Sequence, residues 1–232
     1  MGPPRLPLFV CVSVSRAPFS LCRKAVGIIK FHGHEIVTHP AYRRRRGARK
    51  GELVFHRSER LFLRPIWPED WQGVLGGIRD ESVVRNLATV PWPYDENHAR
   101  EFAGRAFDPF HPTFLATRAS DAAVVGCIGL GAVEGREAVE LGYWIARPFW
   151  GQGFATEAGR AVVGIARVLG HRELESSHFL DNPASGRVLR KLGFEPTGRI
   201  VQRHSCARGQ EVEAAEYRLR LVASEGERQR AA

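Results

Sequence analysis

The sequence predicts an α+β fold, and three patterns along the chain carry that prediction. In residues 60–66, Leu61 and Leu63 fall two positions apart and the basic residues Arg60 and Arg64 flank them, which is the period-two pattern of a half-buried strand. Two helical segments follow, and then three strand-like segments occur in a row, at 113–118, 123–132 and 138–145. The rest of the chain alternates strand-like and helical segments. This order indicates an α+β arrangement without internal repeats.

The first two helices are predicted from their starting residues and their apolar stripes. Pro68, followed by two acidic residues, suits the first turn of a helix that continues to about residue 78. A second helix is expected over about 96–107. The segment between them, 80–94, is predicted to be mostly loop because its two prolines, Pro91 and Pro93, forbid a regular helix.

The C-terminal half is predicted to hold two helices and three strands. Gly170 and Gly193 stand where a helix-ending residue is expected. The helices are placed at 155–169 and 183–192, and the strands at 173–180, 197–202 and 213–222.

The positive net charge is confined to the first part of the chain. Of the 34 Lys and Arg residues, 11 lie in residues 1–50 beside a single acid, whereas residues 51–232 hold 23 against 24 acids. A nearly neutral main domain gives little support to nucleic-acid binding, except through the basic segment. No uncharged run of 18 apolar residues occurs, so no transmembrane helix and no membrane partner are predicted.

Three regions are expected: a basic N-terminal extension over 1–53, a folded domain over 54–222 and a polar tail over 223–232. The extension has several interpretations. It resembles a signal or transit peptide only weakly, and its arginine run at 43–46 could dock on RNA or acidic lipid. A disordered tail is favoured over docking, and a mis-assigned start, with translation beginning near 50–58, is the preferred explanation.

The cysteines predict neither a metal site nor a disulfide framework. Cys11, Cys22, Cys127 and Cys206 are far apart and form no CxxC pair, and the nine histidines show no metal-ligand spacing. Cys127 lies in the apolar run 124–130 and is expected to be a small buried side chain. A reducing, cytoplasmic location fits this pattern best.

A glycine-rich turn at residues 150–155 is the segment that most strongly suggests ligand binding. Gly151 and Gly153 permit positive φ and leave the backbone uncovered, so successive N–H groups can face one concavity at the start of the next helix. Such a concavity suits phosphate oxygens. An ordinary tight turn is the alternative. A Rossmann turn fails because the third glycine is missing, and no Gly-Lys-Ser/Thr follows as a P-loop requires.

Residues 140–158, ELGYWIARPFWGQGFATEA, resemble the cofactor segment of the GNAT superfamily of N-acetyltransferases, in particular the ribosomal-protein-alanine acetyltransferase branch. Residues 181–194 resemble the second signature of that branch, and residues 59–65 resemble its first strand. The resemblance covers about 56–222. It implies a mixed, mostly antiparallel central sheet with helices on both faces. It also implies acetyl transfer from acetyl-CoA, without a metal, directly to a primary amine in a ternary complex.

The resemblance also implies which residues bind coenzyme A. The strands 138–145 and 173–180 are expected to diverge, so that the pantetheine arm can pair with them. Trp150 stands where the superfamily usually has Gln or Arg, and Arg147 is expected to supply charge instead. The cofactor residues implied are Tyr143, Trp144, Ile145, Arg147, Gly151, Gln152, Gly153, Phe154, Ala155, Thr156, Asn182 and Ser185.

Catalytic roles are assigned as hypotheses, each with a plainer alternative. Ser185 would protonate or hydrogen-bond the departing thiolate, and Asn182 would hold the pantetheine amide; alternatively, this segment simply caps a helix. Glu140 is the candidate base, through water, unless it faces solvent or pairs with an arginine. Trp92 and Tyr94 would form aromatic walls for the acceptor, or else anchor their loop.

The acceptor stays open at this point. It could be a protein N-terminus or a small-molecule amine, and the protein could be a monomer or a homodimer. A non-catalytic acyl-CoA-binding or regulatory domain is the main alternative function, and RNA association through the arginine-rich segment is a weaker one.

Overall fold

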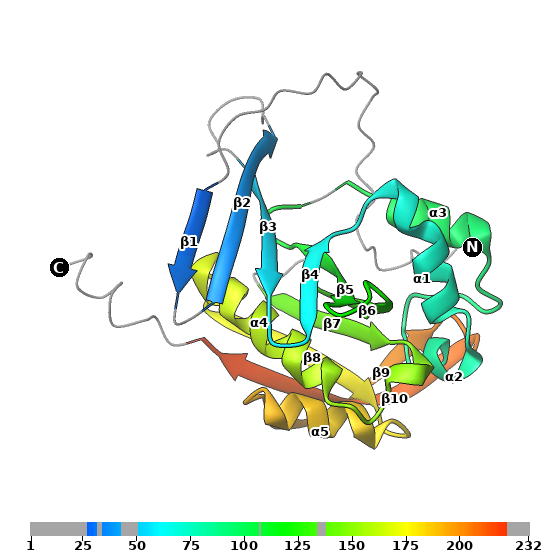
Figure 1. Ribbon diagram of the computed structural model, residues 1–232. Coiled ribbons are helices and arrows are strands. Elements are labelled where there is room, and N and C mark those ends of the chain that lie inside the picture. Colours follow the sequence, from blue (N-terminus) through cyan, green and yellow to red (C-terminus); the bar gives the residue numbers. More distant parts are fainter. Residues whose placement is uncertain (1–26, 32–33, 43–50, 107, 134–137, 222–232) are drawn as a thin grey trace.

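The computed structural model describes residues 27–31, 34–42, 51–106, 108–133 and 138–221, which form one ten-stranded sheet flanked by helices (Figure 1). The order of strands across the sheet is β1-β2-β3-β4-β5-β6-β7-β8-β10-β9. The strands are β1 (Gly27–Phe31), β2 (His34–Tyr42), β3 (Gly51–Arg57), β4 (Leu61–Pro65), β5 (Thr113–Arg118), β6 (Val124–Ala132), β7 (Val139–Ile145), β8 (Glu173–Phe179), β9 (Glu195–Ser205) and β10 (Gln210–Arg220).

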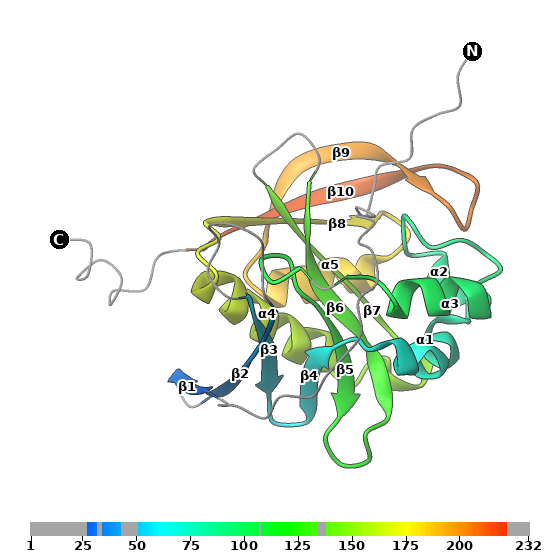
Figure 2. The ribbon, with the colours of Figure 1, turned by 90° about the horizontal axis from the view of Figure 1, so that it is seen from above.

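Helices cover both faces of this sheet (Figure 2). On one face lie α4 (Phe154–Val168) and α5 (Pro183–Lys191). On the other lie the 3-10 turn η1 (Pro68–Asp70) and the helices α1 (Trp71–Ile78), α2 (Glu81–Val84) and α3 (Glu96–Ala103).

Alternate residues of the central strands supply the two cores. Phe114 on β5 and Ile128 on β6 pack with α4, whereas their neighbours Leu115 and Cys127 pack with α1 and α2. A strand buried on both sides shows such continuous burial because successive side chains point to opposite faces. The predicted fold class, a mixed and mostly antiparallel sheet with helices on both faces, is confirmed.

Most predicted elements are present, with differences at their ends. The second helix stops at Ala103 instead of 107, because Gly104 caps its C-terminus. The loop predicted over 80–94 contains α2, whose first turn is capped by the Asp80 carboxylate accepting the Ser82 N–H at 2.9 Å. β9 is longer than predicted, and β10 begins at Gln210 and ends at Arg220 instead of spanning 213–222, because the two strands pair with each other as a hairpin.

The predicted N-terminal extension overlaps three of the observed strands. β1, β2 and the start of β3 fall within residues 1–53 and pair antiparallel in sequence order. The arginine run at 43–46 and the polar tail at 223–232 lie outside the described residues, and the division into three regions stays a prediction. In the described part of the chain, no helix is long and apolar enough to cross a bilayer.

Candidate active site

The site is organised by β7 and β8, the seventh and eighth strands across the sheet, which run parallel to each other. Their register covers only Val139 with Leu174 and Glu140 with Glu175. Beyond these pairs β7 continues beside β6, and β8 continues beside β10. Beyond these pairs, the backbone edges of β7 and β8 that face each other are therefore not paired with each other. The Ser176 hydroxyl on β8 donates to the Leu141 carbonyl on β7 at 2.9 Å. These unpaired facing edges, called the slot below, can pair with an extended chain that carries amide groups, as a sheet edge pairs with an added strand.

The glycine-rich turn follows the C-terminal end of β7, where β7 is no longer paired with β8, and it leads into α4. Gly151 and Gly153 have φ of 73° and 82°, as their sequence context predicts. Gly153 is the N-cap of α4, and no side chain caps the helix there. The first N–H groups of α4 therefore keep their hydrogen-bonding capacity at the positive end of the helix dipole. A Cβ added at Gly151 would meet nothing within 4 Å, so the concavity has room for an anion.

The turn is held in place by Arg60, which the sequence did not single out. Its backbone N–H donates to Glu157 Oε1 at 2.8 Å, and its Nε donates to Oε2 at 2.8 Å. Its NH1 donates to the Gln152 carbonyl at 3.0 Å. Burial on its own would raise the pKa of Glu157, but the hydrogen bonds from Arg60 and Ser58 together hold that pKa below its usual value.

Several predicted cofactor residues offer their backbone more than their side chains. Phe154 and Thr156 are buried side chains, so only their N–H groups can face a ligand. The Gln152 side chain braces the turn by donating to the Pro148 carbonyl at 2.9 Å. Half-exposed Trp150 donates its Nε1–H to the Ile145 carbonyl at 2.6 Å. The turn is thereby stiffened by its own side chains.

Arg147 carries the charge expected near the turn. Its side chain is 65% exposed and its NH1 lies 3.3 Å from Asp80 Oδ2. Hydrogen bonds from Ser82, and then from Arg147, keep the pKa of Asp80 low. This exposed ion pair is weak enough for Arg147 to turn toward an incoming phosphate.

Tyr143, Ser185 and Asn182 meet on the α5 side of the slot. The Tyr143 hydroxyl is buried and has no hydrogen-bond partner among the described residues. Burial raises the pKa of Tyr143 to about 12, and the nearby Ser185 hydroxyl opposes that rise. Asn182 caps α5: its Oδ1 accepts the Ser185 N–H at 3.4 Å and its Nδ2 donates to Ser185 Oγ at 3.1 Å. The capping alternative is therefore present.

Glu140 lies on the opposite face of β7, because its position alternates with that of Tyr143. Its Oε1 accepts a hydrogen bond from Arg203 NH1 at 2.9 Å, so the expected pairing with an arginine is observed. Next on the same face, Gly142 is exposed, and an added Cβ would meet nothing within 4 Å. The slot is thus open on the Glu140 side and closed by Tyr143 on the α5 side.

Trp92 and Tyr94, the predicted acceptor walls, have different surroundings. Trp92 is 39% exposed. Tyr94 stacks on His98 with ring centroids 5.5 Å apart and packs against the α1 core, where burial raises its pKa to about 12. Tyr94 therefore anchors its loop, whereas Trp92 is free to contact a ligand.

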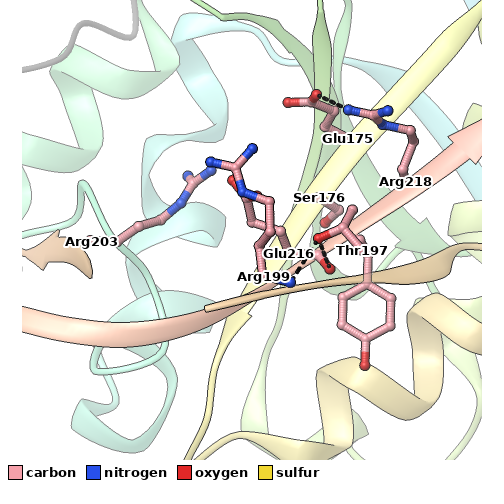
Figure 3. A pocket seen from close by; sticks show the side chains of 8 residues that line it. Glu175, Ser176, Thr197, Arg199, Arg203, Glu216 and Arg218 are labelled. Atoms are coloured by element: carbon pink, nitrogen blue, oxygen red, sulfur yellow. Dashed lines mark hydrogen bonds and ion pairs between the residues drawn. The ribbon is translucent and has the colours of Figure 1, made fainter. Parts of the chain in front are cut away.

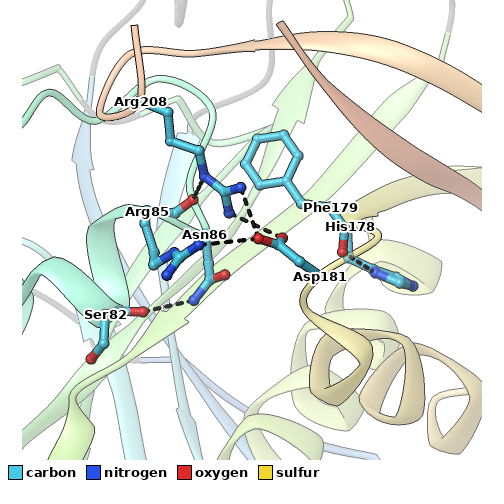
Figure 4. Close-up of polar contacts among 7 residues, drawn as sticks. All are labelled: Ser82, Arg85, Asn86, His178, Phe179, Asp181 and Arg208. Atoms are coloured by element: carbon cyan, nitrogen blue, oxygen red, sulfur yellow. Dashed lines mark hydrogen bonds and ion pairs between the residues drawn. The ribbon is translucent and has the colours of Figure 1, made fainter. Parts of the chain in front are cut away.

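A polar cluster joins three loops around the slot (Figure 4). Arg208, in the β9–β10 turn, donates two hydrogen bonds to Asp181, at 2.8 and 3.0 Å, and one to the Arg85 carbonyl at 2.8 Å. Arg85, after α2, also reaches Asp181 at 3.2 Å. The bonds from Arg208 lower the pKa of Asp181. Because Asp181 directly precedes Asn182, this cluster fixes the α5 side of the slot relative to α2.

Thiol and metal chemistry find little support in the described residues. Cys127 is buried, and burial raises the pKa of its thiol, so it stays protonated and unreactive. In the part of the chain that the structure describes, no group of three His, Cys, Asp or Glu side chains is arranged to hold a metal ion.

The site residues that sequence patterns did not reveal all contact residues that are far away along the chain. Arg60 lies 97 positions from Glu157, and Arg203 lies 63 positions from Glu140. Each arginine sits in an ordinary strand pattern. Glu157 offered the only local signal, as an acid in the first turn of a helix that follows a glycine-rich turn.

Comparison with known proteins agrees with this geometry. Residues 60–195 match the acetyltransferase (GNAT) domain family, and the chain belongs to that family. Among curated proteins, it is 28% identical over 151 residues to an uncharacterized, SPbeta prophage-derived N-acetyltransferase of Bacillus subtilis, YokL. That alignment covers 64% of this chain and 83% of the relative.

Solved structures show the same fold at low sequence identity. A GNAT-family acetyltransferase from Bacillus anthracis superposes with a TM-score of 0.62 at 20% identity, covering 72% of this chain and 98% of that one. Spermidine N-acetyltransferase from Vibrio cholerae, in complex with CoA and spermine, gives a TM-score of 0.60 at 16% identity, covering 70% and 96%.

Proposed function

We propose that this protein transfers the acetyl group of acetyl-CoA directly to a primary amine in a ternary complex. The observation that carries the proposal is the slot between β7 and β8, which ends beside the uncapped start of α4. One region thus offers a strand-like edge for amide groups and a concavity for phosphate. Pantetheine and pyrophosphate, the two parts of coenzyme A that need binding, require these two features.

The residues present fit coenzyme A. The backbone N–H groups at about 151–156 would hold the pyrophosphate, with Arg147 adding charge. The edge of β7 at Tyr143, Trp144 and Ile145 would pair with the pantetheine amides, and Asn182 would add a side-chain contact. When bound, acetyl-CoA would supply the thioester whose acyl carbon passes to the amine nitrogen as its bond to sulfur breaks.

The two faces of the slot divide the proton chemistry. On the open face, Glu140 would take the proton that the acceptor ammonium loses, through water, because only a neutral amine is nucleophilic. On the α5 face, Ser185 and Tyr143 would supply a hydrogen bond or proton to the departing sulfur. With a pKa near 12, Tyr143 stays protonated at neutral pH and remains a donor. A backbone N–H near Trp144 or Ile145 would stabilise the oxyanion.

The spermidine N-acetyltransferase among the structural neighbours supports an amine acceptor as a class. Trp92 would contact the acceptor beside the open face, and Tyr94 would hold the loop behind it. We expect a cytoplasmic protein, monomeric or homodimeric, within the branch that acts on ribosomal proteins or its small-amine relatives.

Thiol release from acetyl-CoA tests the proposal. Purified protein and acetyl-CoA are incubated with one class of acceptor at a time. The classes are amino acids, amino-acid amides, polyamines, aminoglycosides and N-terminal peptides. Acceptor-dependent thiol release, with the acetylated product found by mass, is the expected result. Tight CoA binding without release for any acceptor would contradict it and would favour a non-catalytic acyl-CoA-binding domain.

A further inference from the structure

Eight residues line a pocket of about 300 Å³, and seven of them are labelled in Figure 3. It is formed by β8, β9 and β10, and its volume lies at the small end of the range for small-molecule sites. Two contacts connect it to the slot. Glu175, which lines the pocket, is the register partner of Glu140, and Ser176, also in the lining, donates to the Leu141 carbonyl. The charged lining consists of Arg199, Arg203, Arg218, Glu175 and Glu216.

A β-bulge places one of these arginines over the pocket. Ile200 and Pro196 of β9 pair with Ala215 and Tyr217, so residues 197–199 bulge opposite a single residue of β10. Gly198 has a φ of 79°, and the Arg199 N–H donates to Thr197 Oγ1 at 3.2 Å. Bulges of this kind redirect side chains and occur often beside active sites. Here the bulge carries Arg199 toward the region that Arg203 also reaches (Figure 3).

The Glu140–Arg203 ion pair crosses from β7 to β9 at the boundary between pocket and slot. Both side chains are about one-third exposed, and a single hydrogen bond of 2.9 Å joins them. A simple cationic amine that approached Glu140 would compete with Arg203 and would leave that guanidinium beside another positive charge. A molecule with both an ammonium and a carboxylate can replace the two halves of the pair at once.

We propose that the acceptor is a small zwitterionic amine of amino-acid type, with a carboxylate a few bonds from the amine. Its ammonium would pair with Glu140, and its carboxylate would pair with Arg203 and Arg199. This rests on the proposed acetyl transfer and specifies the acceptor of the same site.

The arginine contacts explain why a carboxylate is the group that the pocket selects. A guanidinium binds a carboxylate through two parallel hydrogen bonds. Arg203 uses one such bond on Glu140, and the Arg199 side chain, 70% exposed, is held by Glu216 only at 3.4 Å. Both can therefore turn to an incoming anion. A polyamine would have to displace arginines that already pair with Glu216, Glu140 and Glu175, and an uncharged amide would leave the carboxylate site unfilled.

Paired acceptors test this specificity. Thiol release is measured for a panel of L-amino acids and for the corresponding amino-acid amides, which keep the amine and side chain but lack the carboxylate. The same panel is run on wild type, Arg203→Gln, Arg203→Lys and Arg220→Gln. Arg220 is the matched control, because it is a more exposed arginine on β10 that does not line the pocket.

In the wild type, kcat/KM for the preferred acid exceeds that of its amide by about tenfold or more, the size of one charge-assisted hydrogen bond. Arg203→Gln lowers this acid-to-amide ratio toward one, Arg203→Lys lowers it less, and Arg220→Gln leaves it unchanged. Calorimetric titration of CoA-saturated protein with the acid and the amide shows the same order of affinities.

The possible contrary results are distinct. Equal or better turnover of amides, polyamines or peptides by the wild type overturns this inference and leaves acetyl transfer standing. An Arg203→Gln variant that folds but slows acids and amides equally also overturns it. If no acceptor of any class causes thiol release from acetyl-CoA, the proposed function itself is overturned.

Discussion

Arg60, immediately before β4, and Glu157, in the first turn of α4, are joined by three contacts of 2.7 to 2.8 Å. Arg60 also reaches the Gln152 carbonyl, and its guanidinium lies 4.5 Å from the Phe154 ring centre. The strand and the helix thereby hold the glycine-rich turn between them. This pair adds to the hydrogen bonds that Trp150 and Gln152 make from within the turn, whose two glycines do not restrict the backbone.

Replacing Arg60 with Ala should weaken coenzyme A binding more than folding. The ion pair is partly exposed, so its loss should lower the free energy of unfolding by about 1 kcal/mol or less. The loosened turn should raise the CoA dissociation constant about fivefold. Calorimetric titration with CoA measures this, and Arg160→Ala, at an exposed site on α4, is the control. Unchanged affinity in Arg60→Ala would show that the turn keeps its shape without Arg60.

Glu157 should make the stability of the protein depend on pH in the acid range. Its pKa is lower in the folded protein than its usual value of 4.5. Its contribution is therefore complete above about pH 4.5 and is lost as the pH falls through the lower, folded-state pKa. Urea unfolding at several pH values should show a weaker dependence in Glu157→Gln than in wild type. Glu59→Gln, at an exposed acid nearby, should follow the wild type.

Two substitutions at Gly153 separate backbone strain from ligand repulsion. Both Ala and Glu must adopt the positive φ of 82°, which costs about 1 to 2 kcal/mol of stability. Glu also places a carboxylate beside the proposed pyrophosphate site. Gly153→Glu should abolish CoA binding, while Gly153→Ala, equally destabilised, retains part of it. Equal CoA affinities in the two variants would mean that the anion site lies elsewhere.

Removing the Tyr143 hydroxyl should lower turnover without lowering the stability of the protein. The buried hydroxyl lacks a partner in the described residues, so Tyr143→Phe should leave the free energy of unfolding unchanged or raise it by about 1 kcal/mol. If the hydroxyl serves the departing sulfur, kcat should fall while CoA affinity holds. Ser185→Ala should behave likewise in turnover. A Tyr143→Phe variant with full kcat would remove Tyr143 from the proposed chemistry.

Arg208 should contribute to stability through its cluster with Asp181. Its side chain is only 14% exposed and makes two hydrogen bonds to that carboxylate, so Arg208→Ala should cost about 1 to 2 kcal/mol. Thermal unfolding measures the loss. Arg187→Ala, an exposed site on α5, should cost much less, and a similar loss in both would argue against the cluster.

The sequence predicted the fold well where local signals decide the structure. The strand over 113–118 was placed exactly, and the long helix begins and ends one residue from its prediction, because glycines flank it. The strand β9 was predicted too short. Its length comes from pairing with β10, and such pairing between strands leaves little trace in the periodicity of either one.

The same distinction holds for the site. The positive φ at Gly151 and Gly153 was predictable, because it follows from residue type and context. The partner of Glu140 could be foreseen only as some arginine. Nothing in the pattern of β9 distinguishes Arg203 from its neighbours, since its contact with Glu140, 63 positions away, arises only in the folded sheet.

The short pairing of β7 with β8, which covers two residue pairs, makes a weak seam in the sheet. A ligand that fills the slot binds only the folded chain, so CoA should raise the melting temperature as its concentration increases. Variants that closed this seam would be more heat-stable and would have no place for the cofactor. Selecting variants for thermal stability in the absence of ligand would thus favour inactive proteins. Stabilised variants of this protein should be selected with CoA bound.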